Sequence, residues 1–251
     1  MYRTKEIAAL AGVHPNTVRI YEEWRYISSV PRGENGYRLY SDLHLFQLSI
    51  ARIAFRCEIV QGRIRAKARA IIEASGKEEF NQALELAQDY LSHLEIQYAR
   101  ALEAIELSEL WMSEEHSIFN ETYTQTYTRS EVAQILDLTP EAIRNWERNG
   151  LLTVPRLPNG SRSYTENEIR QLKIIRTLRA AHYSISAILR LMNKAATMRG
   201  TTAIIKKVLE TPEDHEDIGS VTDRLTYSLE QAIESAKEIV ELLEEKLRSN
   251  V

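Results

Sequence analysis

Cysteine is almost absent from this sequence, since Cys57 is the single one among 251 residues. One cysteine cannot form an internal disulfide, and it cannot supply a site that needs several thiolates from one chain. The six histidines are scattered, and none pairs with a cysteine or an acidic cluster at metal-ligand spacing. No glycine-rich phosphate loop, nucleophile elbow or pair of catalytic carboxylates can be assembled either. We therefore expect no metal site, no cofactor and no catalytic residues, and we interpret the chain as a protein that is not an enzyme.

Long apolar runs are missing as well. No segment approaches the roughly 18 consecutive apolar residues of a membrane span, and the N-terminus lacks the apolar core of a signal peptide. Nine glycines and six prolines are too few for long disordered linkers. These features predict a cytoplasmic protein without a membrane partner.

Charge is present in quantity, but it is unevenly distributed. Lys and Arg outnumber Asp and Glu by 12 to 6 in residues 1–70 and again by 12 to 6 in residues 127–200. Acidic residues dominate the other two segments, by 12 to 2 in residues 71–126 and by 12 to 6 in residues 201–251. Two compact basic regions of this kind favour a polyanionic partner, although a single basic patch is usually a solvated face.

The two basic regions are copies of one unit. Residues 30–40 read VPRGENGYRLY and residues 154–164 read VPRLPNGSRSY, and the register extends from Tyr2 with Tyr127 to Arg52 with Arg176. In each copy an Asn-Gly pair lies between short segments that carry arginine and tyrosine. Because Asn-Gly readily takes the positive φ values of a two-residue hairpin turn, each copy is predicted to contain a small basic β-hairpin.

Two short helices are expected before each hairpin. In the first copy Thr4 can cap the first helix and Gly12 can end it. Pro15 and Pro140 stand where the second helix of each copy begins, and Thr165 can cap the helix that follows the second hairpin. Two short helices joined by a tight turn form a helix-turn-helix.

A long heptad-like helix is predicted after each copy. Apolar residues recur at alternating steps of four and three from Phe80 to Ile105 and again from Leu225 to Leu243, which is the seam of a coiled coil. The predicted fold is therefore mostly α, with two winged helix-turn-helix domains alternating with two long coiled-coil helices. The expected domains are residues 1–74 and 128–198 for the two copies of the repeated unit, 77–118 for the first long helix, 119–127 for a linker, and 201–251 for a helical C-terminal region.

At these residues the sequence resembles the MerR family of bacterial transcription regulators. The resemblance lies in Thr17–Glu22 and Asn35–Tyr40 of the first copy, and in Ile143–Glu147, Gly150–Leu152 and Arg162–Tyr164 of the second. It implies two winged helix-turn-helix domains, and a regulator that bends or untwists promoter DNA and acts together with RNA polymerase. In this family the long helix pairs antiparallel with that of a partner chain.

Candidate DNA-binding residues follow from these motifs. Side chains on the second helix of a helix-turn-helix enter the major groove, and those on a wing reach phosphates or the minor groove. For Arg19 and Arg144 the alternative is a surface ion pair, and for Tyr21 and Trp146 it is an anchor in the core. The recognition-helix candidates are Asn16, Thr17, Arg19, Tyr21, Glu141, Arg144 and Trp146. The wing candidates are Tyr37, Arg38, Tyr40, Arg162 and Tyr164, of which Arg38 and Arg162 are expected to protrude. Weaker candidates for phosphate contact are Arg52, Arg56, Arg176 and Arg179.

The expected partner is double-stranded DNA, which one chain binds as an intrachain pseudo-dimer. Each long helix would then cover the apolar seam of the other, and the unlike recognition helices would read an imperfect palindrome. A homodimer with four such domains is the competing geometry. The rival functions are a coiled-coil scaffold for an acidic partner protein and an architectural DNA binder without promoter activity. An effector ligand is not identified by the sequence, but a thiophilic metal or an iron-sulfur cluster is excluded because Cys57 stands alone.

Overall fold

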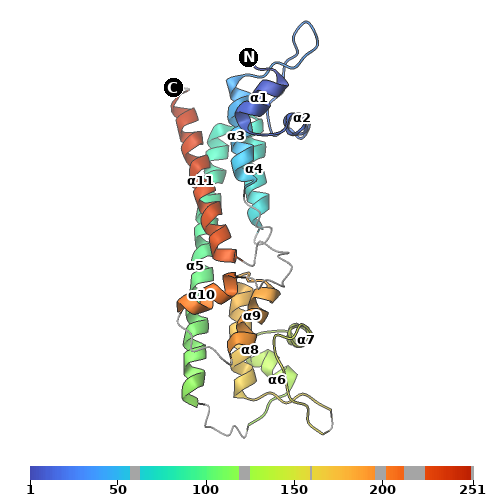
Figure 1. Cartoon of the computed structure of the whole chain (residues 1–251), viewed down its shortest axis with the longest axis vertical. Helices are drawn as coiled ribbons and strands as arrows, with labels where there is room; N and C mark the ends of the chain where they lie inside the picture. The colour runs from blue at the N-terminus through green and yellow to red at the C-terminus, as the bar shows by residue number, and fades with distance from the viewer. Residues whose placement is uncertain (57–62, 119–124, 159, 196–201, 212–223, 250–251) are drawn as a thin grey trace. The chain divides into compact units, whose positions relative to one another are not determined.

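The computed structural model describes all residues except 57–62, 119–124, 159, 196–201, 212–223 and 250–251. Within the described residues the chain forms eleven helices and no strand beyond isolated antiparallel bridges (Figure 1). The prediction of a mostly α protein is therefore confirmed. Cys57 and most of the predicted linker 119–127 lie outside the described residues.

The chain divides into two compact units. Unit 1 comprises Met1–Ile96 together with Ser228–Val251, and unit 2 comprises Gln97–Tyr227. Each unit contains one copy of the repeated sequence. The long helix α5 (Phe80–Ile118) contributes its first part to unit 1 and the rest to unit 2.

Unit 1 begins with helices α1 (Thr4–Ala11) and α2 (Pro15–Glu23), followed by α3 (Asp42–Ala54) and α4 (Ile64–Gly76). Gly12 ends α1 in the left-handed conformation, as predicted, but Arg3 rather than Thr4 occupies the N-cap. The Arg3 backbone N–H donates to the Glu6 carboxylate at 2.7 Å, so the acidic side chain of the first turn completes the cap. The core of this copy is formed by Ile7, Ala8, Ala11, Val18, Ile27, Tyr40 and Leu48, all buried.

Helix α11 (Leu225–Arg248) packs along the first part of α5 within unit 1. The Lys246 ammonium lies 5.8 Å from the centre of the Phe80 ring near the start of α5. Further along, the pKa of Lys237 is raised mainly by Glu234 on its own helix and also by Glu95 of α5. Residues late in α11 thus meet residues early in α5, so the two segments are antiparallel. The coiled-coil description of these helices remains a prediction.

Unit 2 repeats the same order of elements. Helices α6 (Arg129–Ile135) and α7 (Pro140–Arg148) precede α8 (Glu166–Ala180) and α9 (Ile185–Ala195), and α10 (Thr202–Glu210) packs on α9. Thr165 caps α8 as predicted, since its hydroxyl accepts the Asn167 N–H at 3.3 Å and its own N–H donates to Glu168. Gly150, at φ 76°, follows the end of α7.

Between the second and third helix of each copy, the chain turns back on itself with a single antiparallel bridge, Arg32 with Arg38 and Arg156 with Arg162. The predicted two-residue turn is wrong in the first copy. The Gly36 N–H donates to the Gly33 carbonyl at 2.8 Å, and only Gly36 has a positive φ, of 76°. The turn therefore needs one left-handed residue and not two, as in a longer hairpin loop that ends in a glycine bulge.

Candidate nucleic-acid interface

Helix α2 and helix α7 each present one polar face to solvent. Val18 and Ile143 are completely buried and anchor the two helices to their cores. Asn16 and Arg19 are exposed on α2, and Glu141 and Arg144 are exposed on α7. These four side chains are therefore available to a ligand outside the domain.

Both helices start in the same way. Pro15 and Pro140 occupy the first turn, where the missing N–H costs no hydrogen bond. The His14 ring accepts the Asn16 N–H at 3.2 Å, and the Thr139 hydroxyl accepts the Ala142 N–H at 3.1 Å. The caps fix the direction in which the first turn of each helix points.

The two aromatic candidates on these helices are core anchors. Trp146 is 8% exposed. Tyr21 is partly buried, and its ring packs on Tyr26 at 5.6 Å and on Phe55 at 5.9 Å between ring centres. The sequence left two roles open for these side chains, contact with DNA and anchoring in the core, and the burial of both agrees with the second. Thr17 of α2 is partly buried.

Arg38 and Arg162 do not protrude, which corrects the prediction for the hairpins. Arg38 Nε lies 2.5 Å from Glu22 Oε2, and Arg162 Nε lies 3.0 Å from Glu147 Oε2. Both arginine side chains are less than a third exposed. Each glutamate is on the second helix of its copy, so each arginine ties the hairpin to that helix. The prediction failed because the carboxylate partner is 15 or 16 residues away in sequence and meets the arginine only in the folded domain.

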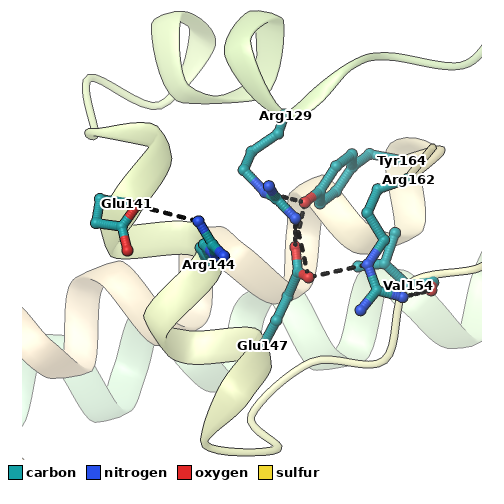
Figure 2. A network of polar contacts seen from close by, with 7 residues as sticks. All are labelled: Arg129, Glu141, Arg144, Glu147, Val154, Arg162 and Tyr164. Carbon is teal, nitrogen blue, oxygen red and sulfur yellow. Dashed lines mark hydrogen bonds and ion pairs between the residues drawn. The ribbon is translucent and has the colours of Figure 1, made fainter. Parts of the chain in front are cut away.

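In the second copy this ion pair belongs to a larger network, which Figure 2 shows. The Glu147 carboxylate also accepts hydrogen bonds from Arg129 at 3.2 Å and from the Tyr164 hydroxyl. Arg129 Nε donates to the Tyr164 oxygen at 3.1 Å, while Arg162 also donates to the Val154 carbonyl at 2.8 Å. Two guanidinium groups thus share one carboxylate whose side chain is only 5% exposed.

Tyr40 and Tyr164 are completely buried, so the expectation that they contact DNA is wrong. Their backbones pair with Tyr2 and Tyr127, which closes each domain. Burial and the hydrogen bond to Glu147 raise the pKa of Tyr164 to about 12. Tyr37 at the first hairpin is different, because its ring is 64% exposed and carries the Arg3 guanidinium 5.2 Å from its centre.

The four weaker candidates have separate environments. Arg52 is exposed on α3, and Arg56 pairs with Glu238 of α11 at 2.7 Å. Arg176 lies 3.8 Å from Asp137, and Arg179 donates to the Tyr183 carbonyl at 2.6 Å. Arg56 and Arg179 therefore hold helices together in the described structure.

Arg129 was not singled out by the sequence reading. The repeat aligns Arg129 with Thr4, so the second copy has an arginine where the first has a threonine. Arg129 is the first residue of α6, before the recognition helix α7, and this position gave no indication that it would meet Glu147. That contact depends on the packing of α6 against α7.

Two helix-turn-helix units, each with exposed polar side chains on its second helix and an arginine-braced hairpin beside it, define a DNA-binding protein. Across the residues with assigned positions, no helix is long and apolar enough to cross a membrane. Those residues also contain no group of three or more His, Cys, Asp or Glu side chains that could hold a metal ion.

Comparison with known proteins agrees with this class. Residues 3–40 match the family described as MerR family regulatory protein, and residues 127–195 match MerR HTH family regulatory protein. The HTH-type transcriptional regulator CueR of Escherichia coli O6:H1 is 32% identical over 102 residues, which are 38% of this chain and 76% of CueR. The regulator ZntR of Escherichia coli K12 is 41% identical over 54 residues, which are 22% of this chain and 38% of ZntR. No solved structure gives a significant match.

The chain belongs to the MerR family, with two MerR-type domains in tandem. It is a DNA-binding transcription regulator and not an enzyme, as the sequence predicted.

Proposed function

We propose that one chain binds both halves of an imperfectly palindromic promoter site and distorts the DNA between them, in the cytoplasm and in contact with RNA polymerase. One observation carries the proposal. The two copies share their hairpin hydrogen bonds, but their recognition helices begin with unlike residues, Asn16-Thr17-Val18-Arg19 and Glu141-Ala142-Ile143-Arg144. Unlike helices read unlike half-sites.

In this proposal the exposed side chains carry the sequence readout. Arg19 and Arg144 take the acceptor edge of guanine or a phosphate, and Asn16 and Glu141 contact neighbouring base edges. Arg38 and Arg162 act through position, since each holds its hairpin against the recognition helix. Tyr37, with Arg3 on its ring, lies at the tip of the first hairpin and is the aromatic side chain available to the DNA backbone there.

Intrachain pairing is supported by the antiparallel contact of α11 with the first part of α5 in unit 1. Apolar side chains of α11 are buried within a single chain, including Leu229, Ala236, Ile239 and Leu243. A seam that is already covered leaves less apolar surface for a second chain. We therefore favour the pseudo-dimer over a homodimer with four DNA-binding domains.

In the test, operators that the protein binds are first selected from random duplex DNA. Light scattering of the complex then gives the number of chains on each operator. The expected result is one chain per operator and a footprint with unlike halves. A helix-transplant variant, Asn16→Glu, Thr17→Ala and Val18→Ile, gives the first turns of the two recognition helices the same residues. It should prefer an operator built from two second-copy half-sites, whereas the unmodified chain should bind that symmetric operator less tightly than the asymmetric one.

A stable dimer bound to a symmetric site would rule the pseudo-dimer out. Salt dependence separates DNA binding from the scaffold function, because neutralised phosphates release counterions and log affinity then falls steeply with log salt. The change in linking number of an operator plasmid, when a nick is sealed with the protein bound, measures how far the protein unwinds the DNA. Such a change separates the distorting regulator from a passive DNA binder.

A further inference from the structure

A cleft of about 340 Å³ lies within unit 2 between the later part of α5 and the end of α8. Its polar lining includes Arg100, Glu103 and Arg176, and its apolar lining includes Ala104, Leu107 and Ala180. A volume of this size is at the lower end of sites that enclose small organic ligands.

Two of the three charged groups that line the cleft have no partner in the described part of the domain, and the third has a distant one. Arg100 and Glu103 make no ion pair or hydrogen bond with any residue that the structure places. Arg176 forms a long ion pair with Asp137, at 3.8 Å, and the Asp137 side chain is 97% exposed. A gap of 3.8 Å exceeds hydrogen-bond length, so the Arg176 guanidinium keeps its donors available.

The other unit shows how such a cleft is normally filled. The repeat aligns Arg56 with Ala180, and in unit 1 the Arg56 side chain bridges α3 to Glu238 of α11 at 2.7 Å. The buried series Leu225, Leu229, Ala232, Ala236, Ile239 and Leu243 of α11 has the same spacing as Tyr90, Leu94, Gln97, Ala101, Ala104 and Ser108 of α5. This alignment places Glu103 at the position of Glu238 and Ala104 at that of Ile239.

At equivalent positions unit 2 therefore has two smaller side chains than unit 1, and it has the same carboxylate. Arginine is replaced by Ala180 on one wall, and isoleucine by Ala104 on the other. The space that they leave is open, and Arg100 lines it from a position where α11 has Ser235.

The walls of the cleft are held apart by a buried wedge. Tyr183, directly after α8, is 0% exposed, and its hydroxyl donates to the Ala101 carbonyl of α5 at 3.5 Å. Burial raises the pKa of this phenol. Arg179 donates to the Tyr183 carbonyl at 2.6 Å and fixes the turn. Collapse of α8 onto α5 would have to displace this ring.

We propose that the cleft binds a small organic anion with a flat apolar body, such as an aromatic carboxylate. The Arg176 and Arg100 guanidiniums bind the anionic group, because a guanidinium presents paired donors that match a carboxylate. Ala104, Leu107 and Ala180 cover the apolar body. The site is independent of DNA, so its failure would leave the proposed regulator function untouched.

The experiment titrates the full chain without DNA with benzoate, and with benzamide and benzamidine as neutral and cationic analogues of the same shape. Binding is measured by ligand-observed NMR and by calorimetry. Benzoate should bind with a dissociation constant of about 1 mM, the value expected for a fragment of this size, and the two analogues at least about 10-fold more weakly. Equal binding of benzamide, or no benzoate binding up to about 10 mM, overturns the proposal.

Two variants locate the binding. Ala180→Arg restores the side chain that unit 1 has at this position, and it should pair with Glu103, fill the cleft and abolish benzoate binding. Arg176→Gln should weaken binding at least about 10-fold. The matched control is Arg52→Gln, because the repeat aligns Arg52 with Arg176, and it should leave the affinity unchanged. Circular dichroism confirms that each variant is folded, and unchanged benzoate affinity in folded Ala180→Arg overturns the assignment.

Discussion

The two copies have the same backbone frame and different polar networks. In the first copy Tyr2 and Tyr40 exchange backbone hydrogen bonds of 2.6 and 2.9 Å, and in the second Tyr127 and Tyr164 do so at 2.8 and 3.0 Å. The glutamate of the second helix differs in its partners. Glu22 pairs with Arg38, whereas Glu147 binds Arg129, Arg162 and the Tyr164 hydroxyl.

This difference changes the local charge. The Glu22–Arg38 pair is neutral, while the Glu147 network contains two guanidiniums and one carboxylate. The hydrogen-bonded frame is the same in both copies, whereas two guanidiniums meet the helix glutamate in the second copy and one does in the first. We infer that the second copy binds phosphate more strongly and that the first contributes relatively more through base contacts.

The largest expected effect comes from the shared carboxylate. Glu147→Gln removes the negative charge between two guanidiniums, and we expect it to lower the stability of the second copy by about 2–3 kcal/mol. The matched Glu22→Gln affects one pair that is partly exposed and should cost about 1 kcal/mol or less. Amide hydrogen exchange measures each copy separately in the intact chain. Equal losses in the two variants would show that the extra contacts of Glu147 do not contribute.

The recognition arginines are expected to have the next largest effect. The Arg144 side chain is 59% exposed, and its guanidinium lies as far as 4.0 Å from the Glu141 carboxylate. This intrahelical ion pair is therefore weak, and the guanidinium can bind a base instead. Arg144→Ala and Arg19→Ala should each weaken one half-site by about 2 kcal/mol if the contact is bidentate to guanine. Competition binding with operators mutated in one half locates the loss. Unchanged affinity in both variants would contradict the assignment of α2 and α7 as recognition helices.

The guanidinium of Arg129 can be removed from the second copy, and an arginine can be placed at the equivalent position, Thr4, of the first. Arg129→Thr gives the second copy the residue of the first, and it should reduce the slope of log affinity against log salt by about 0.9, or about 1 kcal/mol at 0.1 M salt. Thr4→Arg should steepen the slope by a similar amount. Because Arg129 is held by buried Glu147, both variants need a hydrogen-exchange control for domain stability. An unchanged slope in Arg129→Thr would mean that the network is purely structural.

Local features of the fold could be read from the sequence, and features made by distant contacts could not. The caps at Thr165 and the prolines at 15 and 140 depend on neighbouring residues and were predicted correctly. The burial of Tyr40 and Tyr164 and the pairing of Arg38 with Glu22 require the folded domain, so sequence motifs suggested surface roles for side chains that lie inside. The cleft beside Ala180 arises from small residues on two helices far apart in sequence, and no motif marks it.

The smallest expected effect distinguishes the turns that follow the two recognition helices. The repeat aligns Arg25 with Gly150, and both residues are left-handed, at φ 59° and 76°. This conformation costs an L-residue about 1–2 kcal/mol, whereas glycine adopts it freely. Arg25→Gly removes the strain, but it also gives the unfolded chain more freedom, which offsets about 0.4–1 kcal/mol. The net gain in stability of the first copy should therefore be about 0.5 kcal/mol.

The reciprocal Gly150→Ala introduces the strain without a clash, since its new Cβ would meet the nearest atom, of Leu189, at 3.8 Å, and it should destabilise the second copy by about 1 kcal/mol. Hydrogen exchange of the two copies again supplies the measurement. Destabilisation by Arg25→Gly would show that the arginine side chain contributes a contact that outweighs the strain of its backbone.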